Sequence, residues 1–256
     1  WQKTIIREVF GVKRSDGLRR YRRVYLEVPR KNGKSTLVAG IALLLLLADR
    51  EPWAEIYSAA TDLAQARLVF TEAKRMVQSS PVLSAQVEVY QNSIVVPATN
   101  SVYEVLSADV PAKHGINAHG IIFDELHAQP NRDLWDVLTT STGSRRQPLV
   151  VAISTAGHDR QSICWEQHEH AERVRKGTVE DDEFFGTIFG AKEKDDWQAE
   201  STWRRANPNL GVSLKFGYIK AECARAKETP AYQNIFRRLH LNQWTQQESR
   251  WLPMEA

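Results

Sequence analysis

Hydrophobic and polar positions alternate along the first 157 residues in a way that predicts an α/β fold. Short runs rich in β-branched and aromatic residues predict strands, and longer runs with helical periodicity predict helices. Strands are expected at 22–28, 54–59, 87–90, 93–97, 102–106, 120–123 and 149–153, and helices at 35–49, 62–78 and 132–140. Because alternating strands and helices form βαβ units, we expect a mostly parallel central sheet flanked by helices, with a local antiparallel hairpin at Gln91–Ser93.

After about Gly157 the chain changes to long polar or amphipathic stretches. Helices are expected at 162–175, 197–206, 214–227 and 231–242, with one strand at 183–190. His168 and His170 lack the spacing of a metal-binding pair, so we expect them on a polar helix surface. The pattern predicts a core at 1–157, a small, mainly helical lid or linker subdomain packed on it at 158–250, and the start of a further linker at 251–256.

Composition narrows the class of protein only moderately. The 256 residues are 42% hydrophobic and 25% charged, as in an ordinary globular protein, and a net charge of +3 does not by itself indicate a nucleic-acid binder. Cys164 and Cys223 have no metal-ligand spacing, which fits a reducing cytoplasm. No run reaches the roughly 18 apolar residues of a membrane span, so no membrane partner is expected. The chain begins at Trp1 without Met, and we expect both ends to have been trimmed from something longer.

The segment Val28–Ser35 carries the first candidate chemistry. It matches the phosphate-loop pattern GxxxxGK[ST] except at the first position, where Val28 replaces glycine. A strand before it and a helix after it would aim backbone N–H groups and a helix N-terminus at a phosphate. Lys34 would reach the β- and γ-phosphates, Ser35 would hold Mg²⁺, and Gly33 would leave room for the backbone. The alternative is a basic surface turn before a buried helix.

An apolar strand at 120–123 ends in two acids, Asp124 and Glu125. Asp124 would orient Mg²⁺ together with Ser35, and Glu125 would act as the general base on the attacking water. Apolar strands that end in acids are common, so this motif is informative mainly because it follows the phosphate loop in the required order.

A third strand, 149–153, ends in Ser154 and Thr155. Their hydroxyls are expected at the carboxyl edge of the sheet, where α/β folds bind ligands, and could sense a γ-phosphate there. The alternative is that they are ordinary strand-to-loop residues.

Three blocks together, Pro29–Ser35, Ile122–Ala128 and Ile153–Gly157, resemble the ATPase motor domain of tailed-phage terminase large subunits. That family has a RecA-like P-loop NTPase fold of the ASCE class. Its phosphate loop typically lacks the first glycine and carries an early arginine, which agrees with Val28 and Arg30. The resemblance covers nearly the whole chain.

The resemblance implies further site residues. Arg30 would contact the γ-phosphate or couple its loss to movement, and Ser154–Ala156 would be the motif that links hydrolysis to domain motion. Gln2 is similar to the glutamine with which the family reads adenine. The nucleotide site predicted on these grounds comprises Gln2, Arg30, Lys31, Asn32, Gly33, Lys34, Ser35, Thr36, Ser154 and Thr155.

The implied activity is ATP hydrolysis with Mg²⁺, driving viral double-stranded DNA into a capsid within the bacterial host cytoplasm. The implied partners are DNA, further copies in a homo-oligomeric ring, the capsid portal and the small terminase subunit. Trp251–Pro253 looks like the linker before an RNase-H-like nuclease domain, which is expected to be absent, so no DNA cleavage is expected. A helicase-like or other RecA-like DNA-dependent ATPase, and a nucleotide-binding scaffold without turnover, are the alternatives.

Two assignments stay open. The family's trans-acting arginine finger precedes the acid-bearing strand, but here that stretch reads Lys113-His114-Gly115, which leaves Arg145 and Arg146 as alternatives. For DNA contact, the candidates are the turn 143–147 and the basic cluster within 13–23, which contains Arg19, Arg20, Arg22 and Arg23. Either set could equally be solvated surface charge.

Overall fold

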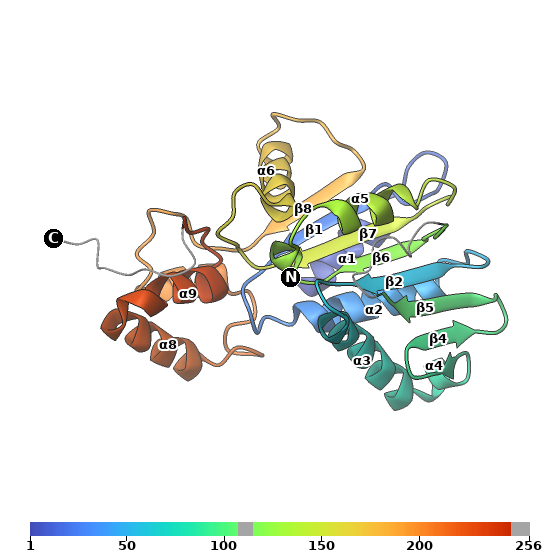
Figure 1. Ribbon diagram of the computed structural model, residues 1–256, viewed down its shortest axis with the longest axis horizontal. Helices are drawn as coiled ribbons and strands as arrows, with labels where there is room; N and C mark the ends of the chain where they lie inside the picture. The colour runs from blue at the N-terminus through green and yellow to red at the C-terminus, as the bar shows by residue number, and fades with distance from the viewer. Residues whose placement is uncertain (107–114, 247–256) are drawn as a thin grey trace.

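One mixed sheet of eight strands forms the centre of the molecule (Figure 1). The computed structural model describes residues 1–106 and 115–246. The strands are β1 (Arg23–Glu27), β2 (Glu55–Ala59), β3 (Glu88–Val89), β4 (Ser93–Val96), β5 (Ser101–Val105), β6 (Gly120–Phe123), β7 (Leu149–Ser154) and β8 (Phe184–Ile188). Their order is β3-β4-β5-β2-β6-β7-β1-β8, parallel from β5 to β8 and antiparallel from β3 to β5. The predicted α/β fold with a mostly parallel sheet is confirmed, as is the β3–β4 hairpin.

Helices cover both faces of this sheet. The apolar cluster on one face joins strand residues to α1 (Gln2–Gly11), α2 (Lys34–Leu47) and α3 (Leu63–Ser79). The cluster on the other face joins them to the short helix η2 (Leu126–Ala128), α5 (Asp133–Thr140) and α6 (Ile163–Arg175). The four-residue helix α4 (Pro81–Ser84) follows α3. Since β7 is buried along its whole length between these layers, it reads as a continuous apolar run rather than an alternating one.

The C-terminal helices have their own apolar cluster. Helices α7 (Glu200–Ala206), α8 (Phe216–Glu228) and α9 (Pro230–Leu241) pack around Trp203, Phe236 and Leu241, and they lie beside the sheet at the end where α2 begins (Figure 1). Strand β8 does not belong to this group, because it pairs with β1 in parallel. The sheet therefore continues past the predicted boundary at residue 157.

Helices α1 and α7 differ from the sequence prediction. Helix α1 was not predicted, yet it buries Ile5 and Val9 against the sheet layer. Helix α7 begins at Glu200, three residues after the predicted start at Trp197, whose carbonyl accepts a hydrogen bond from Trp203 Nε1. Across the described residues, none of the helices combines the length and the apolar character that a bilayer span requires. The predicted linker 251–256 lies outside the described residues.

Candidate active site

The three motif-bearing strands lie side by side. Strand β7 lies between β1 and β6, and all three run parallel, so their carboxyl ends meet at one edge of the sheet. This order places Ser154 and Thr155, at the end of β7, between the phosphate loop after β1 and the acids after β6. One hydrogen bond, from Val28 N to Ser154 O at 3.0 Å, joins the start of the loop to the end of β7.

Lys34 lies at the centre of this edge. Its side chain is buried, and its Nζ donates to Val28 O at 2.7 Å and to Ser154 O at 3.3 Å. The same ammonium lies 3.8 Å from Glu125 Oε1. Burial lowers the pKa of Lys34 below its usual value, and the charges of Glu125 and Asp124 oppose that shift. Lys34 therefore connects all three motifs.

The loop before Lys34 is folded by two residues in the left-handed region. Lys31 has φ +66° and Gly33 has φ +81°. A Cβ on Gly33 would come within 3.1 Å of Gln2 Nε2 and 3.4 Å of Asn209 Nδ2, so glycine is required both by conformation and by space. Gln2 itself donates to Gly33 O at 3.0 Å, which places the predicted adenine reader beside the loop. The side chains of Arg30, Lys31 and Thr36 are exposed, and that of Ser35 is half-buried.

Asn32, predicted as a nucleotide-site residue, turns its side chain into the protein. Its amide Nδ2 donates to Pro29 O and to Asn207 Oδ1, and its Oδ1 accepts from Asn209 N. Asn32 is fully buried by these contacts. Only its backbone is placed to contribute to a phosphate site. The partners Asn207 and Asn209, which follow α7, were missed because nothing in the sequence marks them.

Asp124 follows β6 and is 3% exposed. Burial, helped by the neighbouring charge of Glu125, raises the pKa of Asp124 to about 7. Its Oδ1 is buried and has no hydrogen-bond partner among the residues that the structure describes. A buried carboxylate oxygen without a partner is costly unless a cation or donor reaches it, so the residue fits the predicted Mg²⁺ ligand. Ser35, the second oxygen ligand predicted by sequence, follows Lys34 in the first turn of α2 and is half-buried.

Glu125 adopts the left-handed conformation with φ +50° and ψ +55°. Such a conformation costs about 1–3 kcal/mol for a non-glycine residue and is concentrated at functional sites. Burial alone would raise the pKa of Glu125, but the charge of Lys34 and the hydrogen bond from His127 outweigh it and lower that pKa to about 2. The carboxylate is therefore ionised at neutral pH.

Behind the loop lies a buried carboxylate that the sequence did not single out. Glu27, at the end of β1, accepts hydrogen bonds from Tyr25 Oη at 2.6 Å, His168 Nδ1 at 2.8 Å, Asn242 Nδ2 at 3.2 Å and Trp244 Nε1 at 3.2 Å. Its side chain is 0% exposed. The expectation that His168 lies on a polar helix surface is wrong, because its side chain points inward and hydrogen-bonds the buried carboxylate of Glu27.

The segment after α9 contacts the predicted coupling motif as well. Asn242 Oδ1 accepts from Ala156 N at 2.7 Å, and Asn242 has φ +57°. A Cβ on Gly157 would come within 3.0 Å of the Trp244 ring. Glu27 and Ala156–Gly157 are thus tied to the same two residues of the C-terminal segment.

The candidate arginines lie away from this edge. The turn 143–147 precedes β7, so it is at the opposite end of the strand from Ser154. Arg145 is buried there and donates to Asn117 O and Trp53 O, which excludes it as an exposed finger. Arg146 is exposed. Lys113 and His114 lie outside the described residues.

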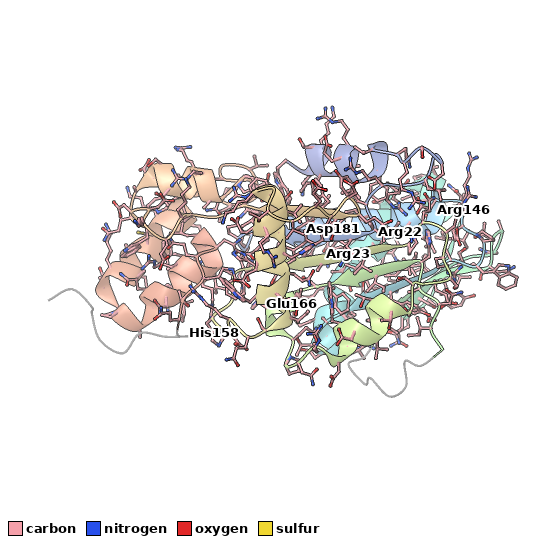
Figure 2. The ribbon with its side chains drawn as sticks, turned by 90° about the horizontal axis from the view of Figure 1, so that it is seen from above. Arg22, Arg23, Arg146, His158, Glu166 and Asp181 are labelled. Atoms are coloured by element: carbon pink, nitrogen blue, oxygen red, sulfur yellow. The ribbon has the colours of Figure 1, made fainter. Side chains whose placement is uncertain are left out.

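The basic cluster is largely paired with acids. Arg19 is 1% exposed and binds Asp49 at 2.7 Å, so it is wrong as a DNA-contact candidate. Arg20 binds Asp182, Arg22 binds Glu183 at 3.3 Å, and Arg23 binds Asp181 at 2.8 Å. Figure 2 labels Arg22, Arg23 and Asp181 near one another. Paired arginines leave little excess positive charge to attract a phosphate backbone.

Comparisons with known proteins point to one family. Residues 1–173 match the family model "Terminase large subunit, ATPase domain". The chain is 34% identical to Protein YmfN of Escherichia coli (strain K12) over 137 residues, which cover 54% of this chain and 30% of that protein. It is 29% identical to the terminase large subunit of Enterobacteria phage HK97 over 223 residues, covering 85% of this chain and 43% of that protein. The chain therefore spans less than half of either relative.

Solved structures support the fold. The crystal structure of the HK97 large terminase superposes with a TM-score of 0.84 at 28% identity, covering 95% of this chain and 50% of that one. The ATPase domain of the Thermus phage P74-26 large terminase superposes with a TM-score of 0.62 at 18% identity, covering 92% and 96%. These neighbours confirm the predicted RecA-like fold.

One expectation is overturned by the same comparisons. Residues 178–256 match the family model "Terminase large subunit, endonuclease domain", so the prediction that this domain is missing is wrong. The expectation rested on Trp251–Pro253, which looks like the linker before a nuclease domain. In the structure, β8 completes the central sheet and α7–α9 pack beside it. Within 1–106 and 115–246, no group of three or more His, Cys, Asp or Glu is arranged to hold a metal ion. With the ATPase-domain model covering about two thirds of its length, the chain belongs to the terminase large subunit family.

Proposed function

We propose that this chain is a Mg²⁺-dependent ATPase whose turnover drives viral double-stranded DNA into a capsid. The observation that carries the proposal is the convergence of Lys34, Asp124–Glu125 and Ser154–Thr155 at one sheet edge, with Lys34 Nζ 3.8 Å from Glu125 Oε1. A phosphate-binding cation, a buried carboxylate oxygen open to a metal ion and an ionised carboxylate are the parts that nucleoside triphosphate hydrolysis requires.

The phosphate loop binds the triphosphate. Its backbone N–H groups and the N-terminus of α2 favour the anion, and Lys34 exchanges its bonds to Val28 O and Ser154 O for phosphate oxygens. Arg30, exposed at the start of the loop, contacts the γ-phosphate, and Gln2 lies where the base would be read. Ser35 and Asp124 hold Mg²⁺, which neutralises charge that develops on the phosphate oxygens.

Glu125 is the general base. Its carboxylate orients a water for in-line attack on the γ-phosphorus and accepts a proton from it. The bond between the γ-phosphorus and the β–γ bridging oxygen breaks, and ADP and inorganic phosphate result. Ser154 and Thr155 lie beside Glu125 and report the loss of the γ-phosphate.

The contacts at the end of β7 couple ATP hydrolysis to movement of the segment that follows α9. The backbone N–H of Ala156 is held by Asn242, and Gly157 packs on Trp244. A displacement of β7's end therefore moves residues that follow α9.

Membership of the family supports a proposal about partners. We propose a homo-oligomeric ring that acts on double-stranded DNA with the capsid portal and the small terminase subunit, in the host cytoplasm. A large terminase from a thermophilic bacteriophage, which shares the fold at 16% identity and a TM-score of 0.58, has been solved in complex with ADP, which supports a nucleotide in this fold.

Nucleotide binding tests the proposal directly. Calorimetric titration with ATP should give an affinity that falls about 10- to 100-fold in Lys34→Ala, since a charge-assisted hydrogen bond contributes roughly 1.5–3 kcal/mol. Chelation of Mg²⁺ should weaken binding to wild type and have a much smaller effect in Asp124→Asn. Lys176→Ala, which removes an exposed lysine paired with Glu172, is the matched control and should bind ATP normally. Equal affinity in wild type and Lys34→Ala would refute the assignment of the loop.

A further inference from the structure

His127 lies between the proposed base and the end of β7. It belongs to η2, directly after the acid pair, and its side chain is 17% exposed. Its Nδ1 is 3.2 Å from Glu125 Oε2 and 3.0 Å from Ser154 Oγ. Its backbone N–H also donates to Ser154 Oγ at 3.1 Å. One residue thus contacts both motifs, through side chain and backbone.

The hydrogen-bond partners fix where the imidazole proton lies. An ionised carboxylate can only accept, so the ring nitrogen that faces Glu125 Oε2 must carry a proton. Ser154 Oγ donates its own hydrogen to Thr155 O at 2.9 Å, so toward His127 it also accepts. Both neighbours therefore select the tautomer with hydrogen on Nδ1.

The Glu125 carboxylate is held from two sides. Oε1 faces Lys34 at 3.8 Å, and Oε2 faces His127 at 3.2 Å and Thr155 Oγ1 at 3.5 Å. Without the imidazole, the strongest remaining attraction on this carboxylate is the buried Lys34 ammonium. Closing onto Lys34 would draw the base away from a water and toward the phosphate-binding residue.

We infer that His127 is a positioning residue for ATP hydrolysis, which holds the Glu125 carboxylate apart from Lys34 and ties it to Ser154 at the end of β7. The inference rests on the proposed function of Glu125 as the base. Because His127 acts through Glu125 and Ser154, it governs the hydrolytic step and not the binding of ATP.

Three substitutions separate positioning from structural support. Asparagine can place an amide nitrogen where Nδ1 lies, glutamine places it nearer the position of Nε2, and alanine removes it. We expect kcat to fall about 100-fold in His127→Ala and His127→Gln, as for a catalytic group displaced by about 1 Å, with the Kd for ATP within about threefold of wild type. His127→Asn should recover most of kcat. His170→Ala, on α6 beside Asp181, is the matched control and should turn over like wild type.

A kcat in His127→Ala equal to that of wild type would overturn the inference. So would an equal loss in His127→Asn and His127→Ala accompanied by a fall in Tm, since that result indicates a structural role. Absence of turnover in wild type would instead count against the proposed function.

An NMR measurement of the protonation site of the His127 ring tests the inference without measuring ATP hydrolysis. Long-range ¹H–¹⁵N NMR of the His127 ring at pH 8 should show the proton on Nδ1 in wild type and a shift toward the Nε2-protonated tautomer in Glu125→Ala. A wild-type ring that bears its proton only on Nε2 would overturn the inference, whether or not the protein hydrolyses ATP.

Discussion

Glu27→Gln is expected to destabilise the protein strongly although it exchanges a single heavy atom. The buried carboxylate accepts four hydrogen bonds, from Tyr25, His168, Asn242 and Trp244. Glutamine offers one oxygen and one NH₂ group. With its oxygen toward Asn242 Nδ2 and Trp244 Nε1, its NH₂ faces Tyr25 Oη and His168 Nδ1, which must then give up the hydrogen bonds they donate and turn to accept.

The magnitude follows from the hydrogen bonds that the substitution breaks. Hydrogen bonds to a charged group contribute about 1.5–3 kcal/mol each, and removing one partner of a buried charged set costs about 3–5 kcal/mol. We therefore expect the free energy of unfolding to fall by about 3–5 kcal/mol, which for a chain of this size corresponds to roughly 6–20 °C in Tm. Glu88→Gln makes the same chemical change at an exposed site beside Tyr90 Oη, and should cost less than about 0.5 kcal/mol.

Thermal unfolding followed by circular dichroism provides the assay, and a double-mutant cycle localises the effect. Trp244→Phe removes one donor to Glu27 while keeping a ring against Gly157, so its cost should shrink when Glu27 is already glutamine. A Glu27→Gln protein as stable as the Glu88→Gln control, or costs that simply add in the cycle, would refute the reasoning.

Three further predictions concern buried polar groups. Burial lowers the pKa of His240 to about 4, so the folded protein favours the neutral imidazole. Neutral His240 therefore contributes to the free energy of unfolding above pH 6.5, and this contribution, about 3 kcal/mol in all, is lost as the pH falls toward 4. Acid titration of stability should show this loss in wild type and not in His240→Phe, and parallel curves would contradict it. Asn207→Ala should weaken ATP binding about 10-fold by releasing the buried side chain of Asn32, and unchanged calorimetric affinity would argue against that link. Arg19→Ala should lower the free energy of unfolding by about 3–5 kcal/mol by removing the guanidinium that pairs with Asp49, while DNA affinity measured by fluorescence anisotropy stays constant; weaker DNA binding by the folded variant would restore Arg19 as a contact.

The strands and the acid-bearing edge were predictable because their signals are local. An apolar run that ends in Asp124–Glu125, and a loop that runs into Lys34 and an apolar helix, each specify their own conformation. Parallel pairing then brings the three strand ends together, whatever the details of the surrounding helices.

The groups that hold the site in place were not predictable, because their partners are distant in sequence. In the sequence, Asn32 looks like a phosphate-binding residue of the loop. In the structure, its side-chain amide donates a hydrogen bond to Asn207, which is 175 positions away. In the sequence, Glu27 looks like the polar end of a strand. It becomes a buried hydrogen-bond acceptor because Asn242 and Trp244, which are distant in sequence, pack against it. His127 offered a signal, since it lies two residues after Glu125, but the proximity of Ser154 depends on the pairing of β6 with β7.

The charge cluster illustrates the converse. Six basic residues within 13–23 suggested a phosphate-binding surface, yet the acids at 181–183, brought beside them by the pairing of β8 with β1, bind Arg20, Arg22 and Arg23. A run of basic residues in a sequence does not show which acidic residues will pair with it in the folded protein.

The central claim is that Glu125 and Lys34 hydrolyse ATP. The direct measurement is Mg²⁺-dependent phosphate release by wild type, Glu125→Gln and Lys34→Ala across a range of protein concentrations. The account predicts turnover in wild type that rises more than linearly with concentration, as subunits complete one another's sites, and none in either variant. Equal background release in all three proteins would contradict it and favour a nucleotide-binding scaffold.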